Sequence, residues 1–293
     1  MDTNVLLLAI SAVALGGVAY FLLSLKWSLT GNLGQRKVNP LKGSAQDALT
    51  LYGFFVPVEN LTSSISPFTS KIETYLRMNG IKFASENTDF KHSPNGRVPY
   101  LQSGEHSISD SRFIVRFLLN TFPKLEKLEP TGEDAAKATL IQRLCEQHIY
   151  FTLQHERAAK PEGVQAIQKL FGDKPWPMPW LLAQAWKIGR LQQMRYEGIL
   201  TLAEEDIDKL VDEDSAALSH LLGKRTWFFG EHPTVTDATV FGFLEAAVHA
   251  EPHSYVHTSV RKHKNLVAFV DRVRQQFYAD RLSKMKGGQG KAQ

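Results

Sequence analysis

The feature that most constrains the fold is a change of pattern near residue 125. Between residues 48 and 125, short apolar runs and amphipathic stretches follow in the order strand, helix, strand, strand, strand, helix, without an internal repeat. From residue 133 to residue 283 the apolar residues recur at helical spacing. A mixed unit followed by a helical unit predicts an α+β chain of two domains, which suits a length of 293 residues.

The mixed unit opens with an aromatic and aliphatic run, LTLYGFF at residues 49–55, which is typical of a buried strand. A helix is predicted from Pro67 to Met78, because proline suits the first helical position and Gly80 suits the stop. The remaining elements expected in this unit are strands at residues 81–87, 98–103 and 106–109 and a helix from residue 110.

The helical unit contains several long periodic stretches, which cover residues 133–159, 179–200, 204–223 and 265–282. Within it, Thr234 and Asp237 form a variant capping box ahead of an apolar run, which indicates a structural role. Residues 284–293 are polar and rich in glycine, so a disordered tail is expected there.

The N-terminal segment from Val5 to Leu25 has no charged residue, and about twenty apolar residues span a bilayer. A cleaved signal peptide is the alternative, but it would have a basic start and a shorter apolar core, whereas this chain starts with Asp2. We therefore interpret residues 1–26 as a transmembrane anchor that precedes the two domains. Residues 27–47 lack periodicity and are interpreted as a linker.

Basic residues follow the apolar segment directly, at Lys26, Arg36, Lys37 and Lys42. The positive-inside rule therefore places the rest of the chain in the cytosol, and the glycosylation sequon at Asn60 is expected to stay unused. The localisation that follows is a single-pass membrane protein of the endoplasmic reticulum or the mitochondrial outer membrane, with a cytosolic soluble part.

The charge balance argues against a nucleic-acid partner. The chain has 34 Lys and Arg against 30 Asp and Glu, a net charge of +4, and no basic block. Its single cysteine, Cys145, excludes an intramolecular disulfide framework and suits a reducing compartment. Because Cys145 lies in an apolar helical stretch, a buried and unreactive thiol is expected.

Histidines are dense between residues 249 and 263. His253 and His257 are four residues apart, a spacing that places two side chains on one helix face. A metal site needs three or four ligands with supporting partners, and Pro252 with its polar surroundings favours a solvated turn. We assign no metal ligand, and the sequence leaves open whether this stretch binds a metal.

Three short motifs carry the candidate chemistry, and each has two interpretations. Ser66 precedes a proline and is either only the cap of a helix or also an active-site hydroxyl. Pro99 stands at the start of a strand, where either a cis Val98–Pro99 bond or a trans proline on an edge strand fits. Asp110 and Ser111 lie where a strand meets a helix, which suits helix capping and also an anion site.

In combination these motifs resemble the glutathione S-transferase superfamily, and within it the failed axon connections family and the related metaxins. The segments that carry the resemblance are ISPFTSKIETYLRM at residues 65–78, GRVPYL at 96–101 and FFGEHPTVTDATVFGFL at 228–244. The resemblance covers residues 48–280 and not the anchor or the linker. It implies a thioredoxin-like N-terminal domain followed by an all-helical C-terminal domain.

The resemblance also implies a role for each motif in binding glutathione, which would be a substrate and not a tightly bound cofactor. Val98, followed by a cis Pro99, would bind the cysteinyl part through its backbone. Asp110 and Ser111 would receive the γ-glutamyl group. Ser66 would be the catalytic residue and would donate a hydrogen bond to the thiolate, which the start of a helix also stabilises.

Two functions remain open at this point. One is a membrane-anchored glutathione transferase that conjugates glutathione to a small electrophile in detoxification or a stress response, a reading that is compatible with a homodimer. The other is a non-catalytic adaptor of the metaxin kind, which binds a protein partner in membrane trafficking or mitochondrial import. The connection GFFVPVENLTSSI at residues 53–65 is longer than transferases usually carry there, so the placement of Ser66 is in question.

Overall fold

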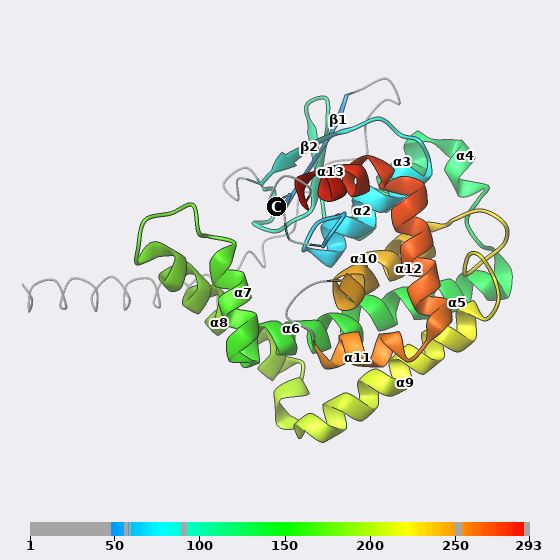
Figure 1. The fold of residues 1–293 in the computed structure, drawn as a ribbon. Coiled ribbons are helices and arrows are strands. Elements are labelled where there is room, and N and C mark those ends of the chain that lie inside the picture. Colours follow the sequence, from blue (N-terminus) through cyan, green and yellow to red (C-terminus); the bar gives the residue numbers. More distant parts are fainter. Residues whose placement is uncertain (1–47, 56–57, 59, 89–92, 250–253, 290–293) are drawn as a thin grey trace, which may run out of the picture. The chain divides into compact units, whose positions relative to one another are not determined.

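The computed structural model describes residues 48–55, 58, 60–88, 93–249 and 254–289 (Figure 1). The expected anchor and linker lie outside these residues. Within the described ranges, no helix combines the length and the apolar character needed to cross a bilayer.

The mixed unit is a four-stranded sheet, and its strand order is β2-β1-β3-β4. The strands are β1 (Leu49–Gly53), β2 (Ala84–Asn87), β3 (Tyr100–Ser103) and β4 (His106–Ser109), and the helices are α2 (Pro67–Met78), α3 (Ser111–Thr121) and the short α4 (Pro123–Glu126). Helix α2 connects β1 to the parallel strand β2, while the other strand pairs are antiparallel. The thioredoxin-like fold predicted from the sequence is confirmed.

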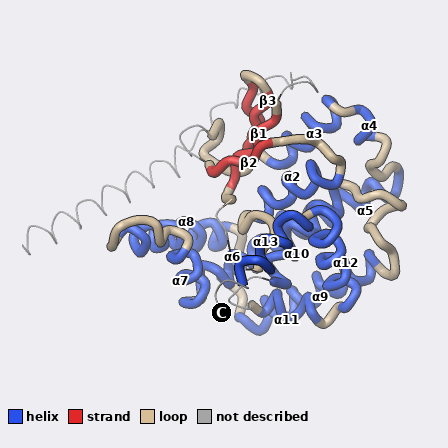
Figure 2. Tube along the Cα trace, turned by 45° about the horizontal axis from the view of Figure 1, so that its top comes forward, coloured by secondary structure: helices blue, strands red, loops and turns tan. Residues whose placement is uncertain are grey.

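The sheet buries one face against its helices. Leu51 and Leu101 lie opposite each other on β1 and β3, and both are fully buried. Their neighbours Tyr52 and Tyr100 point to the other face, where the two rings stack at 4.5 Å between centroids. Figure 2 shows the strands on one side of the described unit, with helices making up the rest.

Three strands are shorter than the sequence predicts, namely β1, β2 and also β3, which begins at Tyr100 and not at Val98. β1 ends at Gly53, where a Cβ atom would lie 2.2 Å from Cγ2 of Thr69 in α2. β2 begins at Ala84 and not at Ile81, because the N–H of Ile81 closes the end of α2 by donating to the carbonyl oxygen of Leu76 at 3.0 Å.

The second unit is helical, as predicted. Its elements are α5 (Gly132–Arg143), a π-helical turn η1 (Leu144–Ile149), α6 (Tyr150–Ala159), α7 (Pro161–Lys169), α8 (Met178–Tyr196), η2 (Ile199–Thr201), α9 (Glu204–Leu222), α10 (Val235–His249), α11 (Tyr255–Arg261), α12 (Lys264–Phe277) and α13 (Ala279–Gln289). Every residue from Val235 to Val248 in α10 is buried, so this helix forms the centre of the helical core.

Helices α2 and α10 pack closely enough to require a glycine. A Cβ atom at Gly242 would lie 2.7 Å from the carbonyl oxygen of Pro67 and 2.8 Å from the backbone nitrogen of Lys71. Lys71 is itself buried, and its ammonium pairs with the buried carboxylate of Glu146 at 2.6 Å. The mixed and helical units therefore share one continuous interior along α2.

The long connection from β1 to α2 is held by the helical unit. The carboxylate of Glu245, buried in α10, accepts hydrogen bonds from the N–H groups of Thr62 at 2.7 Å and Ser63 at 3.1 Å, and from the hydroxyl groups of both residues. This connection is therefore ordered by α10 immediately before α2 begins.

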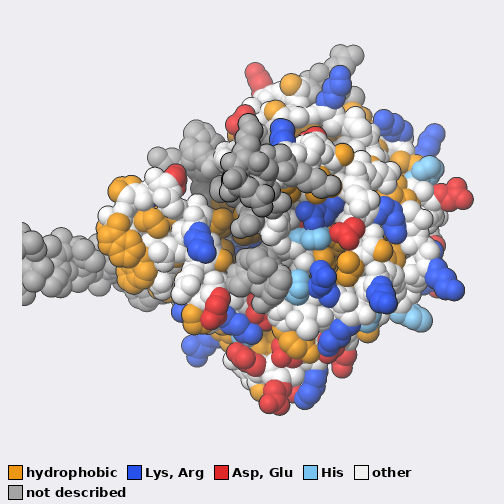
Figure 3. Space-filling model, in the orientation of Figure 1, with side chains coloured by type: hydrophobic (Ala, Val, Ile, Leu, Met, Phe, Trp, Pro, Cys, Tyr) orange, Lys and Arg blue, Asp and Glu red, His pale blue; other side chains and the backbone are white. Residues whose placement is uncertain are grey.

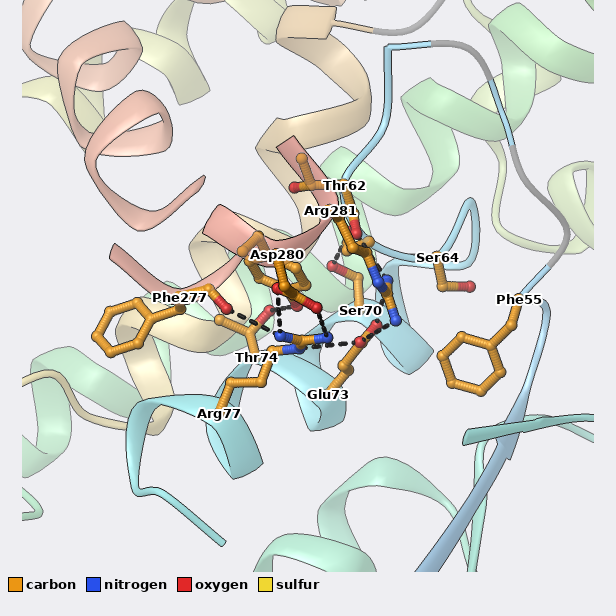
Figure 4. Close-up of polar contacts among 12 residues, drawn as sticks. Phe55, Thr62, Ser64, Ser70, Glu73, Thr74, Arg77, Phe277, Asp280 and Arg281 are labelled. Atoms are coloured by element: carbon orange, nitrogen blue, oxygen red, sulfur yellow. Dashed lines mark hydrogen bonds and ion pairs between the residues drawn. The ribbon is translucent and has the colours of Figure 1, made fainter. Parts of the chain in front are cut away.

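The C-terminal helix α13 (Ala279–Gln289) runs into residues 284–289, which the sequence placed in a disordered tail. Arg281 holds the start of this helix in place. Its guanidinium pairs with the buried carboxylate of Glu73 in α2 and donates to the carbonyl oxygen of Thr62 at 2.6 Å (Figure 4). These contacts tie α13 to both α2 and the connection that precedes it.

The start of α10 confirms the variant capping box. The carboxylate of Asp237 accepts hydrogen bonds from the N–H groups of Phe228 and Thr234, both at 2.8 Å, and from the Thr234 hydroxyl at 2.9 Å. Burial raises the pKa of Asp237 to about 6, although these three donors oppose the shift.

This raised pKa predicts a pH-dependent stability. Because folded Asp237 holds its proton more tightly than the unfolded chain does, its contribution to stability is complete below the ordinary pKa of 3.8 and is lost as the pH rises through about 6. The free energy of unfolding of the wild type, minus that of Asp237→Asn, should fall by about 2–3 kcal/mol between pH 4 and pH 7. Urea unfolding across this range measures the difference, and a constant difference would contradict the prediction.

The Glu245 contact predicts a second stability effect. Glu245→Gln keeps the shape of the side chain but turns one acceptor into a donor that faces the N–H and O–H groups of Ser63. The free energy of unfolding should fall by about 2–3 kcal/mol, because hydrogen bonds to a charged group are lost. Glu231→Gln, at an exposed position, is the matched control and should change the value by less than about 0.5 kcal/mol. Equal urea midpoints for the two variants would rule out the proposed role of Glu245.

Candidate functional site

The register of the sheet brings two of the predicted motifs to the same end. Tyr52 lies opposite Tyr100 on β3, and Tyr100 lies opposite Ser109 on β4. Val98–Pro99 leads into β3 at Tyr100, and Asp110–Ser111 follows the last residue of β4, Ser109. Both motifs therefore lie at the same end of the sheet, which is the carboxyl end of β1.

Helix α2 begins at this end as well. Thr69, in the first turn of α2, packs so closely against Gly53 at the carboxyl end of β1 that no Cβ atom would fit. Ser66 stands three residues earlier in the chain and is therefore held at the same end of the sheet. The long connection leads Ser66 to this position, so all the residues predicted for the site lie at one end of the sheet.

Ser66 is the cap of α2, as one of its two interpretations predicts. Its Oγ accepts a hydrogen bond from the N–H of Thr69 at 3.4 Å, and its own N–H donates to Oγ of Ser64 at 3.1 Å. Among the described residues, no acceptor is bound to the O–H of Ser66. This hydroxyl can therefore donate to a ligand while it caps the helix, where the helix dipole favours a negative charge.

The Val98–Pro99 bond is cis, which decides between the two interpretations of this motif. Pro99 is buried and Val98 is half-buried. The turn before them is braced by Ser93, whose hydroxyl donates to the carbonyl oxygen of Arg97 at 2.6 Å and accepts from its N–H at 3.0 Å. The backbone that leads into Val98 is therefore held in place by Ser93.

Asp110 caps α3 in an unusual backbone conformation. Its φ angle is +75°. Residues other than glycine rarely adopt a positive φ, and those that do are concentrated at functional sites. The carboxylate accepts from the N–H of Arg112 at 3.0 Å and pairs with its guanidinium at 3.3 Å, which raises the pKa of Arg112. Ser111 follows as the first, buried residue of the helix.

A residue that the sequence did not single out also contacts the site. Arg157, near the end of α6, donates from Nη1 to the carbonyl oxygen of Ile65 at 3.3 Å. Burial lowers its pKa, and in the described part of the chain no carboxylate forms an ion pair with it. A cation with no ion-pair partner among the described residues therefore lies beside the residue that precedes Ser66.

An aromatic group lies next to this cation. Phe68, in the first turn of α2, packs edge-on against Tyr150 at 5.1 Å and against Phe243 at 5.3 Å between ring centroids. Tyr150 in turn receives a hydrogen bond from Arg190 at 3.1 Å. The start of α2 thus has an apolar side that faces the helical unit.

The cysteine and the histidines that the sequence analysis considered lie elsewhere in the helical unit. Cys145 is buried, and burial raises its pKa, as expected of an unreactive thiol. His249 is hydrogen-bonded to Asp271 at 3.1 Å, while His253 lies outside the described residues. Within the described ranges, no three His, Cys, Asp or Glu side chains are grouped to hold a metal ion.

Family models identify both units. Residues 67–163 match the glutathione S-transferase N-terminal domain, and residues 211–273 match the glutathione S-transferase C-terminal domain. The structure is similar to a glutathione S-transferase of Methylobacterium radiotolerans in complex with glutathione sulfonate, with 17% identity, a TM-score of 0.51 and coverage of 80% of this chain and 93% of that one. It is also similar to glutathione transferase GSTFuA3 of Phanerochaete chrysosporium, with 17% identity, a TM-score of 0.54 and coverage of 78% and 97%.

Several curated proteins are similar in sequence, and three of them are described here. Failed axon connections of Drosophila melanogaster is 27% identical over 68% of this chain, and the chain spans 50% of its length. Isoprene-epoxide–glutathione S-transferase of Rhodococcus sp. is 25% identical over 78% of this chain and 99% of its own. Human Metaxin-2 is 27% identical over 64% of this chain and 73% of its own. The chain belongs to the glutathione S-transferase superfamily, in which it resembles both a transferase and the failed axon connections and metaxin proteins.

Proposed function

We propose that this chain binds glutathione at the carboxyl end of β1 and conjugates it to a small electrophile. The observation that supports this most strongly is the convergence of Ser66, Val98–Pro99 and Asp110–Ser111 at one end of the sheet. In this proposal the backbone of Val98 binds the cysteinyl part, and Asp110 and Ser111 receive the γ-glutamyl group.

The sulfur of glutathione lies beside the start of α2. There it meets the O–H of Ser66, the positive end of the helix dipole and the nearby guanidinium of Arg157. All three favour the thiolate over the thiol, so the thiol loses its proton near neutral pH. Ser66 is then a hydrogen-bond donor to the nucleophile and not the nucleophile itself.

The electrophile approaches from the apolar side of α2, beside Phe68 and Tyr150. A strained cyclic ether is a suitable class, since one relative that this chain matches over 99% of the relative's length is named for an epoxide substrate. The sulfur forms a bond to a ring carbon, the carbon–oxygen bond breaks, and the oxygen takes a proton from water.

The chain is held to a membrane in this proposal. Residues 5–25 form the anchor, and the basic residues that follow keep the two domains on the cytosolic side, at the endoplasmic reticulum or the mitochondrial outer membrane.

A non-catalytic adaptor is the second candidate. It is favoured by the similarity to Failed axon connections and Metaxin-2, neither of which is named as a transferase. The two candidates differ in one measurable property, which is affinity for glutathione. An adaptor keeps the fold without that affinity.

Removal of one charge should weaken glutathione binding. Asp110→Asn keeps a side chain that caps helices and tolerates a positive φ, so the fold is retained. Loss of a charge-assisted hydrogen bond of about 1.5–3 kcal/mol should raise the Kd at least about tenfold in calorimetric titration. Asp173→Asn, at an exposed position, is the control and should leave the Kd unchanged. A wild type without millimolar affinity would favour the adaptor.

The role of Ser66 is tested through the bound thiol. Ser66→Ala should raise the pKa of bound glutathione by about one to two units, because the thiolate loses a hydrogen bond of about 1.5–3 kcal/mol. Thiolate absorbance measured against pH gives this value. Ser254→Ala removes an equivalent cap from α11 and should lower stability by about 1 kcal/mol without moving the thiol pKa. Coincident titration curves for wild type and Ser66→Ala would show that Ser66 is only a cap.

A further inference from the structure

We propose that the hairpin of α7 and α8 carries a second membrane contact, in which its aromatic tip lies in the headgroup region of an anionic bilayer. This surface is separate from the glutathione site. The inference goes beyond the proposed function and uses only its membrane anchor.

The tip exposes large apolar side chains that a water-soluble surface rarely presents together. At the tip the exposed fractions are 73% for Trp176, 43% for Met178, 44% for Trp180 and 38% for Leu181, and farther along α8 Ile188 is 51% exposed. Figure 3 shows hydrophobic side chains gathered at the end of the molecule that Figure 1 labels α7 and α8.

These side chains are not needed for the packing of the hairpin. It has a small core of its own, formed by Val164, Ile167 and Ala183 with Phe171 and Trp186 packed against them. The exposed residues lie outside this core and outside the main helical core. Packing within the described unit therefore does not account for the presence of these apolar side chains at the surface.

Most of the hairpin is also not matched by either family model. The two family models end at residue 163 and resume at residue 211, so they omit most of α7 and all of α8. The exposed surface is thus carried by a part of the chain that neither family model matches.

The chemistry of the hairpin fits a lipid surface. Tryptophan favours the boundary between headgroups and acyl chains, because its ring is apolar and its N–H is polar. The hairpin, residues 161–196, contains five Lys or Arg against Glu162 and Asp173, so it carries a net positive charge. Positive charge beside exposed tryptophan suits anionic phospholipids.

The rest of the chain makes this contact easy to form. The apolar segment at residues 5–25 is joined to the first domain through the linker at residues 27–47. An anchored unit therefore stays close to the lipid surface, where even a weak contact is populated.

The test uses the full chain in phosphatidylcholine vesicles that contain phosphatidylserine. Trp176→Cys is labelled with the environment-sensitive dye NBD, and Leu140→Cys on α5, whose side chain is 69% exposed, is the control. The native Cys145 is buried and stays unlabelled. We expect a blue shift at residue 176 and quenching by nitroxide-labelled lipid several-fold stronger than at residue 140. Removal of phosphatidylserine should reduce both signals at residue 176.

Three outcomes would overturn the inference. If the chain floats with the vesicles but the dye at residue 176 is no more quenched than the dye at residue 140, the anchor is present and the contact is absent. If the chain does not float with the vesicles, the anchor of the proposed function fails as well. If the blue shift at residue 176 disappears when each vesicle carries a single chain, the surface binds a second copy of the chain and not lipid.

Discussion

A buried carboxylate in α10, Glu245, fixes the position of the candidate site. It binds the connection that precedes α2 through the backbone and hydroxyl groups of Thr62 and Ser63. The same helix approaches α2 so closely at Gly242 that no side chain fits between them. Ser66 is therefore placed at the end of the sheet by the helical unit, and the long connection does not carry it away from the other site residues.

The parts of the fold that follow from local signals were predictable from the sequence. The bounds of α2 are those expected, because Pro67 sets the start and the chain turns at Gly80 with a φ angle of +63°. The capping residue Asp237 was also found from spacing alone. In each case the deciding contacts are made within a few residues, so a sequence pattern records them.

The rest of the site depends on contacts between residues far apart in the chain. Arg157 reaches a carbonyl group 92 positions earlier, and Glu245 reaches Thr62 across 183 positions. No local pattern distinguishes these two residues from other charged side chains of their helices. The same holds for the positive φ of Asp110, because a capping side chain is compatible with several backbone conformations. The sequence therefore identified the residues of the mixed unit and missed those that the helical unit contributes.

One contact joins the exposed hairpin to the candidate site. A Cβ atom at Gly163 in α7 would lie 2.3 Å from the carbonyl oxygen of Glu156 and 2.6 Å from Cα of Arg157, so the two backbones touch at the end of α6. Arg157 then donates to the carbonyl oxygen of Ile65, immediately before Ser66. Because backbones in such contact cannot move independently, the position of the hairpin and the position of this guanidinium are set together. The end of α6, which holds Arg157, and the start of the hairpin at Gly163 are thus fixed in position by one backbone contact.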